Sequence, residues 1–281
     1  MSVTEDIMTK KVATVKPSSN ILEAQQLMAE HRIYRVVVID SQNKPVGIIT
    51  QKDIVNFLVT DTSRRSVENV KAEEVMSKGL VTVKPIAPIP YAAGHMTRKK
   101  ISSLIVADSD NKLKGIVTKT DVVMYLAIKG AGLHKVREFM TKKPITVKPT
   151  DSIFTTVYLM AKHKISRVVV TDNQNKPIGI VALSDTSTIP GLFKPPKTAK
   201  DKPIFVKGII TPPYGTHLLL ARDIMTANPI AVTEDSDLAG VAKLMTRHGF
   251  SGLPVVDKYT RKLLGIVTKS DLTRAVASWR K

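Results

Sequence analysis

A short motif that occurs four times along the chain constrains its fold more than any other feature. Its last copy is Gly-Ile-Val-Thr-Lys-Ser-Asp at residues 265–271, and related copies stand at 47–53, 115–121 and 179–185. A glycine followed by two β-branched residues predicts a short buried strand, and the threonine and aspartate stand where a helix begins. A fourfold repeat of this kind predicts four copies of one small structural unit.

A second motif opens each of these units. It consists of an acidic residue, an apolar residue, methionine and then threonine or serine, and its methionines are Met8, Met76, Met140 and Met225. A short extended piece, a segment with apolar residues at helical spacing, a valine-rich strand and the glycine strand follow, which predicts the order β-α-β-β-α. Pro88, Pro90 and Gly94 interrupt the helical segment of the second unit, so we expect that helix to start late.

The repeats divide the chain into four units and one insertion. The units cover residues 1–62, 70–128, 134–188 and 220–281, and the insertion covers 189–219. The insertion is rich in proline and lysine, and its apolar pieces at 204–206 and 209–210 can form a small hairpin. One unit cannot cover both faces of its own sheet, so we expect an α/β fold in which the units pair into two pseudo-twofold modules, about residues 1–128 and 129–281.

The composition limits the class of protein and its partners. The formal net charge of +19 favours anionic partners such as nucleotides, nucleic acid, acidic proteins or a membrane surface, although a lysine-rich solvated surface explains it equally well. The chain has no cysteine, which excludes disulfides and thiolate zinc sites. It shows no apolar run long enough for a membrane span and no secretory layout at its N-terminus, so we expect a cytoplasmic protein.

The motifs together resemble those of cystathionine-β-synthase-type (CBS) domains. The residues that carry the resemblance are the Asp-Ile-Met-Thr opening at 6–9, the Val-Val-Val-Ile-Asp strand at 36–40 and the strand-to-helix step at 47–53. Four such domains in tandem form two Bateman modules. The resemblance covers nearly the whole chain except about residues 189–219. It implies a regulatory protein that binds adenosine-containing ligands, such as AMP, ADP, ATP or S-adenosylmethionine derivatives, in clefts between paired domains.

The resemblance also implies which residues line the purine pockets. They are Thr14, Val15, Thr82, Val83, Tyr34, Arg35, Ser102 and Ser103.

The strand-to-helix step has a chemistry that suits such a ligand. The N-terminus of a helix offers free backbone N–H groups and partial positive charge to a phosphate. The threonine adds a hydroxyl for a phosphate oxygen, and the aspartate accepts hydrogen bonds from ribose hydroxyls. The three complete pairs are Thr50 with Asp53, Thr118 with Asp121, and Thr268 with Asp271. The same spacing is also that of a capping box, which stabilises a helix without any ligand.

The third unit departs from this pattern. It carries Ala182 in place of the threonine but keeps Asp185, and Arg167 can supply positive charge. A lost hydrogen bond to a charged phosphate costs about 1.5–3 kcal/mol. We therefore expect the site of this unit to be empty or to hold a ligand without a tightly bound phosphate.

The sequence favours a sensor over an enzyme or a nucleic-acid-binding protein. Binding to nucleic acid is the alternative that the charge suggests, but aromatic residues make up only 5% of the chain and no arginine-rich helix is visible. No catalytic grouping or metal cluster stands out, so we expect no catalytic cofactor and no metal. The expected partners are an adenosine-containing small molecule and an unidentified regulated protein, and a homodimer is a further expectation.

Overall fold

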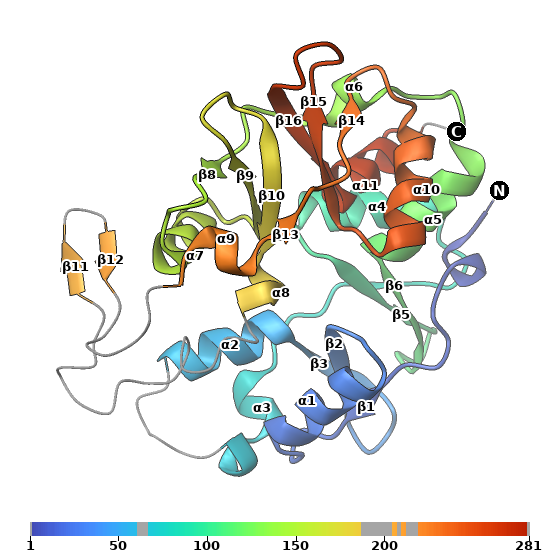
Figure 1. Ribbon diagram of the computed structural model, residues 1–281. Helices are drawn as coiled ribbons and strands as arrows, with labels where there is room; N and C mark the ends of the chain where they lie inside the picture. Colours follow the sequence, from blue (N-terminus) through green and yellow to red (C-terminus); the bar gives the residue numbers. More distant parts are fainter. Residues whose placement is uncertain (1, 61–66, 187–203, 207–208, 212–218, 280–281) are drawn as a thin grey trace. The chain divides into compact units, whose positions relative to one another are not determined.

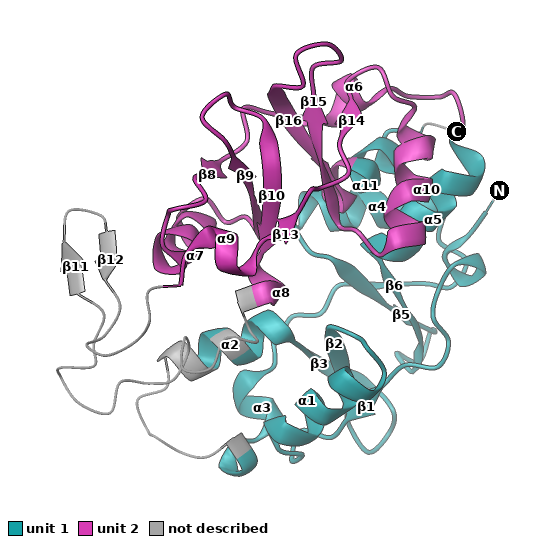
Figure 2. Cartoon of the chain, viewed as in Figure 1, with its two compact units in different colours: residues 1–130, 272–281 teal, residues 131–271 magenta. Residues whose placement is uncertain are grey.

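The computed structural model describes residues 2–60, 67–186, 204–206, 209–211 and 219–279 (Figure 1). The chain divides into two compact units (Figure 2). Unit 1 consists of residues 1–130 and 272–281, and unit 2 of residues 131–271. Each unit contains the strands of two repeats, so the predicted α/β fold of paired repeats is confirmed.

Unit 1 contains two copies of the predicted order, each preceded by a short helical turn. Its first repeat comprises η1 (Thr4–Asp6), β1 (Thr14–Val15), α1 (Ile21–Glu30), β2 (Arg35–Ile39), β3 (Pro45–Thr50) and α2 (Gln51–Thr60). Its second repeat comprises η2 (Val67–Asn69), α3 (Ala72–Val75), β4 (Thr82–Val83), α4 (Ile89–Arg98), β5 (Ser103–Ala107), β6 (Leu113–Thr118) and α5 (Lys119–Lys129). The sheet orders are β1-β2-β3 and β4-β5-β6, with the first pair of each sheet parallel and the second antiparallel.

Unit 2 repeats this plan. Its third repeat comprises α6 (Val136–Phe139), β7 (Thr141–Lys142), β8 (Thr146–Val147), α7 (Ile153–Lys162), β9 (Arg167–Thr171), β10 (Pro177–Ala182) and α8 (Leu183–Thr186). Its fourth repeat comprises α9 (Ala221–Ile224), β13 (Thr226–Ala227), β14 (Val232–Thr233), α10 (Leu238–His248), β15 (Gly252–Val256), β16 (Leu263–Thr268) and α11 (Lys269–Ala277), of which 269–271 belong to unit 2.

The insertion forms the predicted hairpin. β11 (Ile204–Val206) pairs antiparallel with β12 (Ile209–Thr211) (Figure 1). The rest of the predicted insertion up to residue 218 lies outside the described residues.

The helix of the second repeat does not start late, so that expectation was wrong. α4 begins at Ile89 and has ten residues, as α1 has. Pro88 is its N-cap and Pro90 lies in its first turn, where a missing backbone N–H breaks no helical hydrogen bond. Gly94 lies inside the helix, and a Cβ there would meet no atom within 4 Å.

The opening motif of each repeat joins the sheet of its partner repeat. In unit 1, Thr9 forms an antiparallel bridge with Ile116 of the second repeat, with N–H···O distances of 2.9 and 3.0 Å. Ser77 forms the matching bridge with Ile48 of the first repeat. In unit 2, β13 pairs with β10, and β7 pairs with β16. The two repeats of a unit therefore complete each other's sheets.

The methionine of the opening motif contacts the glycine of the strand motif across each pair. A Cβ on Gly115 would lie 2.6 Å from Met8 Sδ, and one on Gly265 would lie 3.2 Å from Met140 Sδ. Gly47 meets Met76, and Gly179 meets Met225, in the same way. Only glycine lets the opening motif of the partner repeat approach the strand so closely. The two motifs of the sequence are thus the two halves of one contact.

The middle strands have two buried faces because each sheet packs on both sides. In β2, Val36 and Val38 pack into a core that residues of α1 form together with Val70 and Ala72 of the second repeat. The alternate residues Val37 and Ile39 pack with Ile105, Ile116 and neighbours from the second repeat. In unit 2, Val169 likewise packs with Leu263 and Ile266. This accounts for valine-rich strands without polar alternation.

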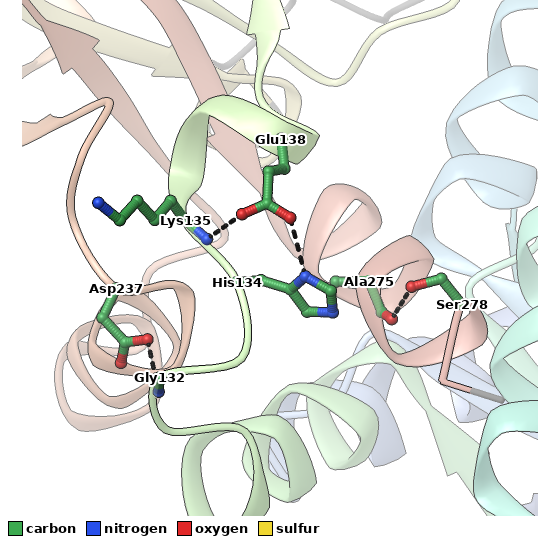
Figure 3. A network of polar contacts seen from close by, with 7 residues as sticks. All are labelled: Gly132, His134, Lys135, Glu138, Asp237, Ala275 and Ser278. Atoms are coloured by element: carbon green, nitrogen blue, oxygen red, sulfur yellow. Dashed lines mark hydrogen bonds and ion pairs between the residues drawn. The ribbon is translucent and has the colours of Figure 1, made fainter. Parts of the chain in front are cut away.

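Carboxylates fix the segment that opens unit 2 (Figure 3). Asp237 Oδ1, at the N-cap of α10, accepts from the Gly132 N–H at 3.0 Å. Glu138 accepts from the Lys135 N–H at 2.7 Å, and its other oxygen lies 2.9 Å from His134 Nδ1. The hydrogen bond from the Lys135 backbone and then the His134 contact lower the pKa of Glu138. The start of the third repeat is thereby tied to the fourth.

Candidate ligand sites at the strand-to-helix junctions

Three of the four junctions have the same polar geometry. In the first, the Thr50 N–H and hydroxyl both donate to Asp53 Oδ2, at 2.8 and 2.6 Å. The corresponding distances are 2.7 and 2.8 Å for Thr118 with Asp121, and 2.8 and 2.8 Å for Thr268 with Asp271. This is the capping arrangement that the spacing also predicted. In each of these junctions the threonine hydroxyl donates its hydrogen bond to the aspartate. A hydrogen bond from this hydroxyl to a phosphate therefore stays a prediction.

The third junction keeps the backbone geometry without the hydroxyl. The Ala182 N–H donates to Asp185 Oδ2 at 2.8 Å, as the threonine N–H groups do elsewhere. The absence of the side-chain hydrogen bond is therefore a property of residue 182 and not of a different fold.

We expect Ala182→Thr to raise the free energy of unfolding by about 0.5–2 kcal/mol, because it restores this hydrogen bond at a helix N-cap. The measurement is chemical denaturation of the full chain. Ala182→Val is the matched control, since valine has the shape of threonine but no hydroxyl. Equal stability of the two variants would contradict the prediction.

A cavity of about 340 Å³ lies at the first junction, within unit 1. Repeat one contributes Ile48, Thr50 and Asp53 to its lining, and repeat two contributes residues 77–81 and 100–103. The Ser77 hydroxyl donates to Asp53 Oδ1 at 3.3 Å. Asp53 therefore lines a partly open space together with residues of both repeats.

The cavity combines apolar walls with positive charge. Its apolar lining includes Ile48, Leu80 and Ile101, and its lysines are Lys78 and Lys100, both exposed residues. An apolar pocket with a few polar groups is the usual form of a small-molecule site. The two lysines come from loops of the second repeat, and the sequence motifs did not mark them.

The predicted pocket residues are distributed unevenly around this cavity. Ser102 and Ser103 line it, whereas Leu80 and Val81 line it in place of the neighbouring Thr82 and Val83. Tyr34 is 61% exposed. The side chains of Val15 and Val83 are buried; Thr14 is half-buried and Thr82 exposed.

Arg35 acts on the second junction. It pairs with Thr50 across the β2–β3 ladder, but the carboxylate that influences its charge is Asp121 of the other repeat. Burial lowers the pKa of the Arg35 guanidinium, and Asp121 opposes this effect. Burial likewise raises the pKa of Asp121, against the hydrogen bonds from Thr118 and the charge of Arg35. A largely buried cation and a partly buried anion thus act on each other near the second junction.

In unit 2, Arg167 holds the position that Arg35 holds in unit 1. Its Nη1 donates to the Ser251 carbonyl at 2.7 Å. Burial lowers the pKa of its guanidinium, and Asp185 and then Asp271 raise it. The sequence analysis assigned the charge of Arg167 to the third repeat alone. It did not predict the contact with Ser251, because the two residues are far apart in the chain.

The described part of the chain contains no group of three or more His, Cys, Asp or Glu residues placed to hold a metal ion. None of its helices combines the length and the apolar character that a membrane crossing demands.

The chain is similar to several proteins of archaea. An uncharacterized protein of Methanocaldococcus jannaschii is 29% identical over 99% of this chain. The match covers only 62% of that protein's length. An uncharacterized 33.4 kDa protein from a ribosomal RNA operon of Thermofilum pendens is 28% identical, over 94% of this chain and 87% of that protein. A crystal structure of another Methanocaldococcus jannaschii protein matches with a TM-score of 0.77 and 22% identity, over 98% of this chain and 99% of that one. At that identity the match supports the fold alone.

A family model identifies the repeats directly. The model described as "CBS domain" matches residues 3–60, 72–128, 136–186 and 221–278. The matches cover most of the chain and leave out the insertion. The chain therefore belongs to the CBS domain family, of which it carries four domains.

Proposed function

We propose that this chain is a regulatory sensor that binds adenosine-containing ligands between its paired CBS domains and catalyses no reaction. The cavity at Asp53 carries the proposal, because it places a carboxylate, apolar walls and two lysines around one partly open pocket. Ligands of this class are what the resemblance to CBS domains implies.

Each part of such a ligand has a counterpart in the cavity. The Asp53 carboxylate accepts hydrogen bonds only, so it suits the two hydroxyls of a ribose. Ile48, Ile101 and Leu80 offer apolar surface to a purine ring. Lys78 and Lys100 attract a phosphate or carboxylate group at the exposed side. A ligand bound in this way contacts both repeats, and so it links their arrangement to its own concentration.

Regulation follows from binding to both repeats at once. A ligand that binds the paired state stabilises it by about 2.7 kcal/mol at a concentration of 100 times Kd. A regulated protein that contacts the same pair senses this change. The alternative is binding of nucleic acid through the net charge of +19, but the lysines are spread along the sequence and form no block.

We expect AMP, ADP, ATP or S-adenosylmethionine to bind the full chain with micromolar affinity, which corresponds to about 8 kcal/mol per site. The measurement is calorimetric titration with each compound, together with the thermal shift of the chain. An oligonucleotide of mixed sequence serves as the control ligand. Absence of heat and of thermal shift with all four compounds would contradict the proposal. Tight and steeply salt-dependent binding of the oligonucleotide would support the alternative.

A further inference from the structure

Arg167 extends from the third repeat onto the fourth, within unit 2. It is the first residue of β9 and pairs with Ala182 of β10, next to the third junction. Its Nη1 nevertheless donates to the Ser251 carbonyl of the fourth repeat at 2.7 Å. The side chain therefore connects the strand of one site to the strand of the other.

Gly252 provides the space for this connection. It pairs with Thr268 at the end of β16, next to the fourth junction. A Cβ on Gly252 would lie 2.9 Å from Arg167 Cδ and 3.3 Å from Thr268 Cγ2. Any larger residue would push the arginine away, so the glycine lets it pass beside the threonine of the fourth site.

Two carboxylates act on the same guanidinium. Asp185 closes the third junction and Asp271 closes the fourth, and both favour the charged form of Arg167 against the effect of burial. Asp271 is itself only 3% exposed. Charges that are shielded from water interact strongly and are little weakened by salt.

Unit 1 lacks this arrangement. There the position equivalent to Gly252 is Ser103, which pairs with Thr118. The Nη1 of Arg35 is buried and makes no hydrogen bond among the described residues, and Asp121 is the carboxylate that acts on it. One arginine thus faces one site in unit 1, whereas one arginine lies between two sites in unit 2.

We propose that Arg167 is a cation shared by the two ligand sites of unit 2, so that an anionic ligand bound at one site weakens the binding of a second anionic ligand at the other. This inference rests on the proposed function. The first phosphate meets a guanidinium that the hydrogen bond to the Ser251 carbonyl holds in place. The second phosphate meets the same guanidinium already neutralised, beside two aspartates. A neutral ligand such as adenosine escapes this effect.

The test measures AMP at each site of unit 2 separately. All chains carry Asp53→Asn and Asp121→Asn, which weaken the sites of unit 1. Asp185→Asn then leaves the fourth site. Asp271→Asn leaves the third, where AMP is expected to bind more weakly because Ala182 offers no hydroxyl to its phosphate. Arg167→Met is introduced into both backgrounds, and AMP and adenosine are titrated by calorimetry. Arg222→Met is the matched control, because Arg222 is an exposed arginine of the same unit, with 57% of its side chain accessible.

A shared cation requires Arg167→Met to weaken AMP in both backgrounds, by about 10-fold or more, since a hydrogen bond to a charged group is lost in each. The chain that keeps both Asp185 and Asp271 must in addition bind its second AMP more weakly than the single-site chains do, and binding at the two single-site affinities overturns the inference. Adenosine affinity and the Arg222→Met chains stay unchanged. A loss in one background only assigns Arg167 to one site and overturns the inference. If Asp271→Asn does not fold, Thr268→Val replaces it. If the unsubstituted chain binds neither AMP nor adenosine, the proposed function fails first, and the inference fails with it.

Discussion

Replacing Gly265 by alanine is expected to lower the free energy of unfolding by about 1–3 kcal/mol, the usual cost of overpacking a tight contact. The new Cβ would lie 2.7 Å from the Thr141 carbonyl oxygen and 3.2 Å from Met140 Sδ. A methionine side chain can move aside, but the carbonyl belongs to β7, which pairs with β16 at this point. Relief of the clash therefore costs part of the ladder that joins the two repeats of unit 2.

Gly240→Ala is the matched control within the same unit. Gly240 lies in α10, and a Cβ there would come no closer than 3.7 Å to another atom. Gly240 is the third residue of α10 and donates its N–H to the Asp237 cap, which alanine would keep. The variant is therefore expected to gain stability, by at most about 0.8–1.0 kcal/mol, the amount that favours alanine over glycine in a helix interior. Chemical denaturation of both variants measures the difference. If Gly265→Ala is as stable as Gly240→Ala, the close contact between the repeats does not constrain residue 265.

The repeated pattern was sufficient to predict the fold because the information is local. Apolar spacing, turn residues and the glycine strand each depend on neighbours in sequence, and four copies reinforced one another. Pairing followed from the uncovered face of a single sheet. The contact between Met8 and Gly115 could not be predicted in this way, because it joins residues of different repeats.

The error at α4 has a physical origin in the position of its prolines. Proline breaks a helix when its missing N–H and its ring fall in the interior. Pro88 and Pro90 stand at the N-cap and in the first turn, where the N–H groups have no helical partner in any case. The prediction was wrong because it placed these prolines in the interior of the helix, whereas they stand at its start.

The candidate site was predictable only in part, because only some of its residues lie within one sequence motif. The junction of Thr50 with Asp53 could be read from the repeat, since its residues lie within one motif. Lys78 and Lys100 come to the cavity from the other repeat, on loops without a periodic pattern. The contact of Arg167 with Ser251 depends on the space that glycine leaves at position 252. Nothing in the local sequence links residues 167 and 252.

The sharpest test of the sites compares two identical substitutions, Asp53→Asn and Asp185→Asn. We expect Asp53→Asn to weaken the adenosine ligand in the unit 1 cavity by about 10- to 100-fold, because a carboxylate that accepts from the ribose hydroxyls is replaced by a neutral amide. Asp185→Asn is expected to leave the tight binding of adenosine ligands intact, because the third junction has Ala182 in place of threonine and so offers no hydroxyl to a phosphate.

Both substitutions also alter a helix cap, so stability must be measured beside affinity. Each aspartate accepts a backbone N–H at 2.8 Å, and weakening such a cap costs about 1 kcal/mol. Asp53 also accepts from the Thr50 hydroxyl, so Asp53→Asn is expected to lower the stability more than Asp185→Asn does. A loss of ligand with Asp53→Asn, counted by calorimetric titration under conditions where both variants are folded, would separate binding from capping. If Asp185→Asn removes a tightly bound nucleotide while Asp53→Asn removes none, the threonine–aspartate pairs are helix caps, and the ligand binds elsewhere in the chain.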